Sequence, residues 1–187
     1  MTTRHKNLLD ASQAVLVVVD LQEGFRDVIF EFDEIVARTA IVIEAAKVLG
    51  LPILVTEQAP TKLGGTIEEI KRILPPSVVP LAKSAFSSCG ADGFLTALES
   101  LKRRQVLLCG IEAHVCMNQT AHDLLSHSHQ VHVLADCTSS RTPENRRVGI
   151  EKMTLSGALP SSSEMAIFEL MRDSKHEQFR AISKLVK

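Results

Sequence analysis

The sequence predicts an α/β fold, a three-layer α/β/α sandwich with a mainly parallel sheet of five to six strands. Apolar runs of strand length alternate along the chain with segments of helical periodicity. The strand runs are apolar at consecutive positions, which is typical of a sheet covered by helices on both faces. No repeat, low-complexity tract or long linker interrupts this alternation. We therefore expect residues 1–187 to form a single domain.

The first half of the chain predicts three strands and two helices. Residues 14–20, "AVLVVVD", form a continuous apolar run that ends in an acid. Residues 33–50 place apolar side chains near a 3.6-residue period and stop at Gly50, a favourable helix terminator. The apolar run 51–57 predicts the second strand. Residues 78–84 predict a short third strand, weakened by Pro80, and 94–103 predict the next helix.

The second half continues the alternation. Strands are expected at 105–111 and 130–137, with a short final strand at 159–161. Helices are expected from Ala113 to Ser126, over 144–158, and in two C-terminal segments at 162–172 and 175–186.

The composition is that of an ordinary soluble protein. Charged residues make up 23% of the chain, apolar residues 45%, and the net charge is −1. This balance favours neither nucleic acid nor an anionic membrane as a partner. The longest apolar runs are too short to span a bilayer, and the N-terminus lacks the apolar region of a secretion signal. The four cysteines form no C-x-x-C pair, so we expect free thiols in a reducing cytoplasm.

Three chemically distinctive residues follow predicted strands. Asp20 closes the first strand, Lys83 follows the third, and Cys116 lies just past the fourth. In an open parallel sheet, ligands bind beyond the carboxyl ends of the strands. Each residue has an ordinary structural interpretation by itself: a turn cap, a surface charge and a small core side chain. Together they predict a reactive site.

The chemistry that this set supports is acyl transfer through a thioester. The N-terminus of a helix favours a thiolate, and a neighbouring carboxylate can accept the thiol proton and return it to a leaving group. Lys83 would keep the carboxylate ionised and stabilise the thiolate. Free backbone N–H groups in the first turn of the same helix could hold an oxyanion. We therefore expect the sulfur of Cys116 to be unusually anionic.

Three segments of the chain resemble the signature segments of the isochorismatase-like cysteine hydrolases. They are "VVVDLQEGF" (17–25), "LAKSAFSS" (81–88) and "CGIEAHVCMNQTAHDL" (109–124), in the family's order. Two further segments, "VTEQAPTKLGGTIEEI" (55–70) and "VHVLADCTSSRT" (131–142), resemble the isochorismatase domain-containing branch. The resemblance covers roughly residues 12 to 180.

This resemblance implies a Rossmann-like sheet and assigns roles to the site residues. Cys116 would be the nucleophile, Asp20 the proton acceptor and donor, and Lys83 the electrostatic partner of both. A non-proline cis peptide bond would join Ile111 and Glu112. The backbone N–H groups of Glu112 and Cys116 would form an oxyanion hole. Oligomers are common in the family, so a homo-oligomer of two or more subunits is expected.

The chain departs from the family in ways that narrow its function. Residues 51–83 contain no histidine or aspartate, whereas zinc-containing nicotinamidases carry an Asp-x-His motif and a further histidine there. Glu57 alone would be a poor start for a tetrahedral zinc site, so we predict no metal and no cofactor. The same absence argues against nicotinamide as the substrate. The cysteine argues against isochorismate, because the namesake enzymes use acid catalysis and lack it.

Other polar and aromatic residues are further candidates for the site. Phe25 is a candidate wall of the substrate pocket, with packing elsewhere as the alternative. Gln22 and Gln58 are candidate amide contacts to a substrate or to a strained loop, with a solvated loop position as the alternative for each. His114 lies two residues before Cys116 and would suggest a Cys–His dyad. Side chains two positions apart on a helix face different ways, which disfavours this dyad. Three further groups are assigned structural roles: surface positions for His127, His129 and His132, loop contacts for Asp136 and Arg141, and packing or loop positions for Cys89, Cys109 and Cys137.

The sequence leaves three functions open. The first is a metal-independent cysteine hydrolase acting on a small amide or related acyl substrate with an Asp20–Lys83–Cys116 triad. The second is a non-catalytic protein that keeps the hydrolase pocket for a ligand or partner. The third is a nucleotide-binding domain of similar architecture, which the lack of a glycine-rich phosphate loop disfavours.

Overall fold

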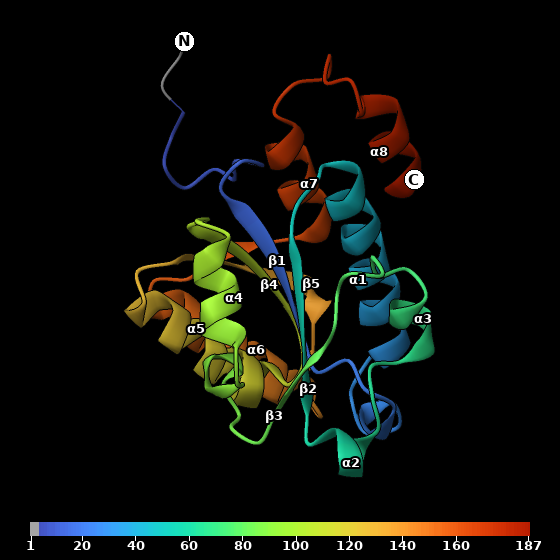
Figure 1. Cartoon of the computed structure of the whole chain (residues 1–187), viewed down its shortest axis with the longest axis vertical. Helices are drawn as coiled ribbons and strands as arrows, with labels where there is room; N and C mark the ends of the chain where they lie inside the picture. Colours follow the sequence, from blue (N-terminus) through green and yellow to red (C-terminus); the bar gives the residue numbers. More distant parts are fainter. Residues whose placement is uncertain (1–3) are drawn as a thin grey trace.

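A fully parallel sheet of six strands lies between two layers of helices (Figure 1). The structure is a computed structural model that describes residues 4–187. The strand order is β3-β2-β1-β4-β5-β6. The strands are β1 (Ala14–Val19), β2 (Ile53–Gln58), β3 (Leu81–Lys83), β4 (Gln105–Gly110), β5 (Gln130–Thr138) and β6 (Leu159–Ser161). The predicted α/β sandwich with five to six strands is confirmed.

The helices cover the sheet in two sets, seen on opposite sides of the strands in Figure 1. One set contains α1 (Phe32–Val48), α3 (Glu68–Lys71), α7 (Ser163–Met171) and α8 (Phe179–Leu185). The other contains α4 (Phe94–Ser100), α5 (Asn118–Ser126) and α6 (Pro143–Leu155). Short elements are η1 (Glu23–Phe25), α2 (Pro60–Leu63), η2 (Ser88–Gly90) and the π-helix η3 (Ala113–Met117).

The alternation of side chains along β1 divides the core between these layers. Leu16 and Val18 pack in a cluster that includes residues of α1 and α7. Val15, Val17 and Val19 pack in a second cluster with residues of α4, α5 and α6. All six residues of β1 are buried, because the strand is central and covered on both faces.

Strand order reverses at β1. The chain proceeds from β1 to β2 and β3 in one direction, and later from β4 to β5 and β6 in the other. The carboxyl ends of β1 and β4 therefore diverge into connections that leave on opposite sides. This is the position at which open α/β sheets hold their ligands.

Several element boundaries differ from the sequence prediction by a few residues; the last helix, expected over 175–186, spans only Phe179–Leu185. The strand expected over 78–84 is limited to Leu81–Lys83, because the Val78 N–H donates to the Pro75 carbonyl in a turn and Pro80 has no N–H for the ladder. The helix expected over 94–103 ends at Ser100, just before Lys102 enters the left-handed region. The helix expected from Ala113 begins as the π-helix η3 and becomes α-helical only at Asn118.

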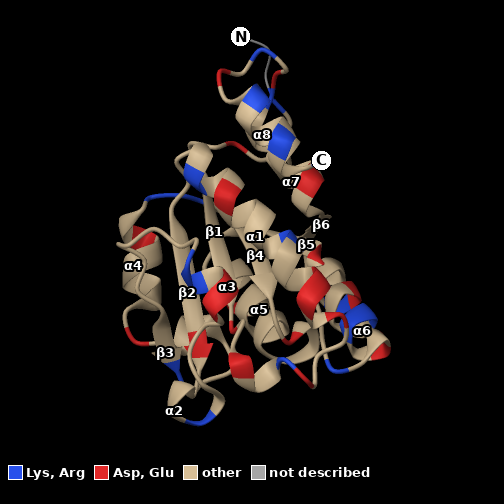
Figure 2. Ribbon diagram, turned by 90° about the vertical axis from the view of Figure 1, so that its right-hand side faces the viewer, with Lys and Arg blue, Asp and Glu red and all other residues tan. Residues whose placement is uncertain are grey.

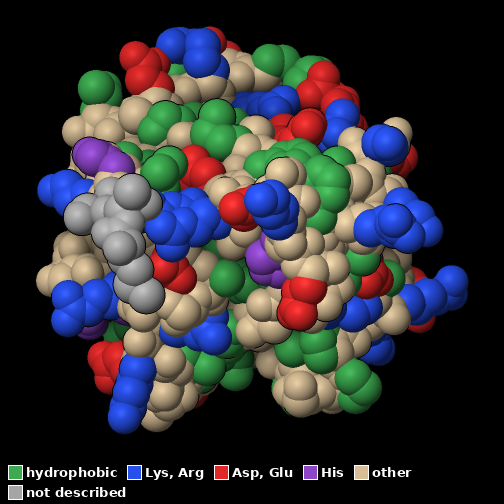
Figure 3. Space-filling model, turned by 90° about the horizontal axis from the view of Figure 1, so that it is seen from above, with side chains coloured by type: hydrophobic (Ala, Val, Ile, Leu, Met, Phe, Trp, Pro, Cys, Tyr) green, Lys and Arg blue, Asp and Glu red, His purple; other side chains and the backbone are tan. Residues whose placement is uncertain are grey.

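The surface mixes charges of both signs. Lys and Arg positions are interspersed with Asp and Glu positions along the ribbon in Figure 2, and side chains of both signs are mixed on the face of the molecule seen in Figure 3. Within residues 4–187, no helix combines the length and the apolar character that crossing a membrane requires.

Candidate active site

Asp20 stands at the end of the central strand with its carboxylate fully buried. It directly follows β1, has a left-handed backbone (φ 56°), and its N–H donates to the Thr56 carbonyl of β2 at 3.1 Å. The left-handed conformation ends the extended strand and turns the chain out of the sheet. The carboxylate is consequently held inside the protein at the point of strand-order reversal.

Lys83 ends β3 and reaches Asp20 across β2. Its Nζ lies 2.7 Å from Asp20 Oδ2, and neither side chain has any solvent-exposed surface. The parallel register places Lys83 opposite Gln58, and Nζ also donates to Gln58 Oε1 at 2.6 Å and to the Phe86 carbonyl at 3.0 Å. Three close acceptors use the three protons of the ammonium group. The buried charge is therefore both paired and hydrogen-bonded.

Cys116 joins this pair from the turn that follows β4. It lies in η3, only 4% of the residue is exposed, and its Sγ is 3.8 Å from Gln58 Oε1. The peptide bond between Ile111 and Glu112, just before η3, is cis. The Val115 and Met117 N–H groups both donate to the Glu112 carbonyl, which begins the helical turn that carries the thiol.

Gly110 allows β4 to approach the end of β1 closely enough to form this site. Its φ is 120°, and a Cβ at this position would lie 2.0 Å from the Val19 carbonyl oxygen. No side chain fits that space, so glycine is required where the two strands diverge.

Burial keeps the thiol neutral, contrary to the sequence-based expectation of an anionic sulfur. Desolvation, reinforced by the Asp20 charge and opposed by Lys83, raises the pKa of Cys116 to about 12. Desolvation also raises the pKa of Asp20, against the opposing effects of Lys83, Cys116 and Thr56. Cys116 therefore carries a protonated thiol beside a buried carboxylate that can accept its proton.

Sequence comparison assigns the chain to a known family. The isochorismatase domain profile matches residues 14–165, which include Asp20, Lys83 and Cys116. The chain belongs to the isochorismatase family.

Individual family relatives cover nearly the whole chain. Isochorismatase domain-containing protein 2 of Homo sapiens is 42% identical over 93% of this chain and 83% of its own length. The secreted isochorismatase effector Isc1 of Phytophthora sojae is 40% identical over 99% of this chain and 90% of its own. Among solved structures, the MAR1 ribonuclease of Caenorhabditis elegans is similar with a TM-score of 0.92 and 37% identity, covering 96% of this chain and 92% of that one. The chain therefore falls within the isochorismatase domain-containing branch.

The three pocket candidates of this isochorismatase-family chain have different positions. Gln58 lies within the site, between Lys83 and Cys116. Gln22 is fully buried and donates its side-chain amide to the carbonyls of Gln58 and Gly64, so its contacts are structural. Phe25 is partly buried and packs against the core cluster that includes residues of α1.

Polar residues around Glu112 tie the turns after β4 and β5 together. Arg141 Nε lies 3.0 Å from Glu112 Oε1, and its Nη2 lies 3.4 Å from His114 Nε2. His114 Nδ1 is 3.0 Å from the Ser140 hydroxyl, so this ring is engaged away from the thiol. Asp136 instead accepts from the N–H and hydroxyl groups of Ser163. The loop-connecting roles predicted for Arg141 and Asp136 match these contacts.

The remaining histidines and cysteines lie apart from the Asp20–Lys83 pair. His127 is exposed and His129 half-buried in the loop before β5. The surface position predicted for His132 is wrong, because this residue lies in β5 and is only 2% exposed. Cys109 and Cys137 are fully buried in the core, and Cys89 is half-buried in η2. Within residues 4–187, no three His, Cys, Asp or Glu side chains gather in a geometry suited to a metal ion.

A buried chain of hydroxyl groups extends from Asp20 and was not predicted. The Thr56 hydroxyl donates to Asp20 Oδ1 at 2.9 Å and lies 3.3 Å from the Ser88 hydroxyl. Thr120 of α5 donates to the same Ser88 hydroxyl at 3.2 Å and accepts from the Ser88 N–H at 2.8 Å. Thr56 and Gln58 are two residues apart on β2 and therefore share a face. Because β2 pairs with the strand that precedes Asp20, this two-residue spacing was the sequence signal that could have placed Thr56 in the site together with Gln58.

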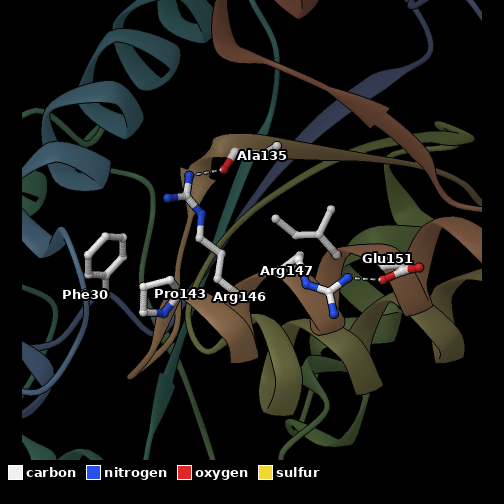
Figure 4. A pocket seen from close by; sticks show the side chains of 7 residues that line it. Phe30, Ala135, Pro143, Arg146, Arg147 and Glu151 are labelled. Carbon is white, nitrogen blue, oxygen red and sulfur yellow. Dashed lines mark hydrogen bonds and ion pairs between the residues drawn. The ribbon is translucent and has the colours of Figure 1, made fainter.

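Two cavities lie near this part of the fold. A depression of about 400 Å³ borders Lys83 and is lined also by Ala59, Thr61, Ala82, Ser84, Gly90 and Asp92. A groove of about 620 Å³ runs along α6, with Phe30, Ala135, Pro143, Arg146, Arg147, Ile150 and Glu151 as its lining (Figure 4). In Figure 4, Arg146 points to the Ala135 carbonyl and Arg147 to Glu151, so both guanidinium groups already have partners. The groove contains none of the three predicted catalytic residues.

Proposed function

We propose that the chain is a metal-independent cysteine hydrolase that cleaves a C–N amide bond or a related acyl bond in a small substrate. The observation that carries this proposal is the buried ion pair of Lys83 and Asp20, 2.7 Å apart, next to the Cys116 thiol. A carboxylate held inside a protein beside a protonated thiol is arranged for general-base catalysis. Membership of a hydrolase family supports the same reaction class.

The first half of the reaction forms a thioester. Asp20 accepts the thiol proton while the sulfur attacks the substrate carbonyl carbon, so the S–C bond forms as the carbonyl π electrons move to oxygen. The backbone N–H groups of Glu112 and Cys116 are the proposed donors to this oxyanion. Collapse of the intermediate breaks the C–N bond, and Asp20 returns the proton to the departing amine. Lys83 stays an ammonium and balances the carboxylate.

The second half releases the acid. Asp20 removes a proton from water as the water oxygen attacks the thioester carbon. The tetrahedral intermediate then expels the sulfur, which takes back the proton from Asp20. The site returns to its starting protonation state, with one acid and one amine produced from one amide and one water.

A panel of small amides, with RNA included because a structural relative is named a ribonuclease, tests this proposal. Mass spectrometry of the intact protein should show an acyl adduct on Cys116 with a true substrate, and Cys116→Ala and Cys116→Ser should abolish turnover. Cys89→Ala, which removes a half-buried thiol outside the proposed triad, should leave turnover unchanged. Turnover that survives in Cys116→Ala would refute the mechanism. RNA cleavage lost in that variant would replace the amide with a phosphodiester.

A second function, ligand binding without turnover, is favoured by the low exposure and neutral state of the thiol. A compound of this kind would raise the melting temperature equally in the wild type and in Cys116→Ala, with no acyl adduct and no product. Acyl adduct formation in the wild type would exclude this function for the compound concerned.

We also propose that the protein works in the cytoplasm as a homo-oligomer. The free state of all four cysteines supports a reducing compartment. Cell fractionation and native mass measurement test the two statements separately.

A further inference from the structure

The side-chain amide of Gln58 lies between the two reactive partners, the ammonium of Lys83 and the sulfur of Cys116. Its Oε1 accepts from Lys83 Nζ at 2.6 Å and lies 3.8 Å from Cys116 Sγ. Its Nε2 donates to the Ser84 carbonyl at 3.0 Å. A carbonyl can only accept and an ammonium can only donate, so these two partners fix which end of the amide faces the sulfur.

The backbone of Gln58 is held as firmly as its side chain. Its N–H donates to Gln22 Oε1 at 2.6 Å, and its carbonyl accepts from Gln22 Nε2 at 3.0 Å. The buried Gln22 side chain thus acts like a neighbouring strand that continues the pairing of β2. The position of the Gln58 side-chain amide is therefore determined by Lys83 and Ser84, which bind the amide itself, and by Gln22, which binds the backbone.

An acceptor oxygen beside the sulfur has opposite effects on the two protonation states of the thiol. It accepts a hydrogen bond from S–H, but its negative end repels S⁻. The charge of Lys83 opposes this repulsion, but the ammonium protons are directed at Asp20, Gln58 and the Phe86 carbonyl. The charged groups that act on the sulfur are Asp20, which follows β1, and Lys83 at the end of β3. Glu112, in the turn before the thiol, is paired with Arg141.

We propose that Gln58 is a positioning residue that keeps the Cys116 proton on sulfur in the resting site while aiming the Lys83 ammonium at Asp20. This proposal rests on the proposed hydrolase function and adds to it a residue that controls the protonation state of the nucleophile. The proton leaves only when an entering acyl group gives the sulfur a bond to form. A neutral amide suits this role, because a carboxylate at the same place would add a second negative charge beside Asp20, and an apolar side chain would release the ammonium.

The test compares alkylation of Cys116 by iodoacetamide in the wild type, Gln58→Met and Gln58→Glu between pH 6 and 10, with each cysteine followed by peptide mass spectrometry. The thiolate displaces iodide, so the rate reports the fraction of Cys116 that is ionised. Gln58→Met removes the acceptor and frees an ammonium proton, and should react about tenfold faster at pH 8, as a one-unit fall in pKa requires. Gln58→Glu adds a negative charge and should react about tenfold slower.

Two controls separate this effect from loss of structure. Gln119→Met changes an exposed glutamine on α5 and should react at the wild-type rate. Cys109, fully buried, should stay unmodified in every variant, and its alkylation would identify a variant that has opened. If Gln58→Met opens in this way, Gln58→Glu, which keeps an acceptor for Lys83, still tests the direction of the shift.

The outcomes are distinct from those that test the hydrolase function. Rates in both Gln58 variants that match Gln119→Met, or that move in the same direction, would overturn the role of Gln58 whether or not an amide substrate exists. Faster alkylation in Gln58→Met together with slower alkylation in Gln58→Glu would support it even if Cys116→Ala kept full turnover, a result that would refute only the proposed reaction. The reverse pattern would overturn it.

Discussion

The ammonium nitrogen of Lys83 lies 2.7 Å from a carboxylate oxygen of Asp20, although 63 residues separate them in the chain, and both side chains are fully buried. A buried pair of this kind gains Coulombic energy only by losing the hydration of both ions. It is therefore a poor device for stability alone. Its position at the reversal of strand order, next to a thiol, suits catalysis better.

Removing one partner of this pair should destabilise the fold more than removing both. Lys83→Met leaves a carboxylate buried without its counter-ion and should lower the free energy of unfolding by about 3–5 kcal/mol. The double variant Lys83→Met with Asp20→Leu should recover a large part of that loss. Urea denaturation measures both, and Lys102→Met, on an exposed lysine, provides the control. A double variant less stable than Lys83→Met alone would contradict the interpretation.

The hydroxyl of Thr56 should favour the ionised form of Asp20. It donates to Asp20 Oδ1 at 2.9 Å, so Thr56→Val, which keeps the shape but loses the donor, should raise the pKa of the Asp20 carboxyl further. The acid limb of the pH–activity profile should then move to higher pH, with a stability loss of about 1 kcal/mol. Thr96→Val, on the exposed side of α4, should leave the limb in place. An unchanged limb in Thr56→Val would show that another group controls it.

Gly110 should be the glycine at which alanine is least tolerated. Gly110→Ala would place a Cβ 2.0 Å from the Val19 carbonyl oxygen and separate the ends of β1 and β4. Gly157 also has a positive φ, 109°, but its Cβ would meet nothing within 4 Å. Gly157→Ala should therefore cost only about 1 kcal/mol of conformational strain, and Gly110→Ala several times more. Equal melting temperatures in the two variants would disprove the steric argument.

His132 should make the fold sensitive to mild acid. Burial lowers the pKa of His132 to about 4, below its ordinary value of 6.5, so protons bind the unfolded chain more readily than the native one. Stability from this group is present above pH 6.5 and is lost as the pH falls toward 4, by roughly 3 kcal/mol in all. His132→Leu should flatten the dependence of unfolding free energy on pH in this window. His127→Leu, at an exposed position, should follow the wild-type curve. A wild-type slope in His132→Leu would assign the acid sensitivity to other groups.

The fold could be predicted from the sequence because strands that are buried on both faces appear as continuous apolar runs. The runs around β1, β4 and β5 were predicted within a few residues. The start of β3 was missed because three residues give too little pattern, and the preceding turn depends on a contact between Val78 and Pro75. The surface position predicted for His132 was wrong because the sequence pattern of an apolar strand is the same whether the histidine ring faces solvent or the core.

For the candidate site, the sequence by itself determined which chemical groups follow the strands: an acid, an ammonium and a thiol. Strand order is set by long-range pairing, so only the tertiary structure decided that Lys83 reaches Asp20 across β2 and that Gln58 lies between Lys83 and Cys116. Protonation also depends on what surrounds a group, and it was burial that made the sulfur neutral where the local helix-start pattern predicted an anion. The sequence gives the identity of each residue directly, whereas exclusion of solvent and the set of neighbouring charges are properties of the folded chain.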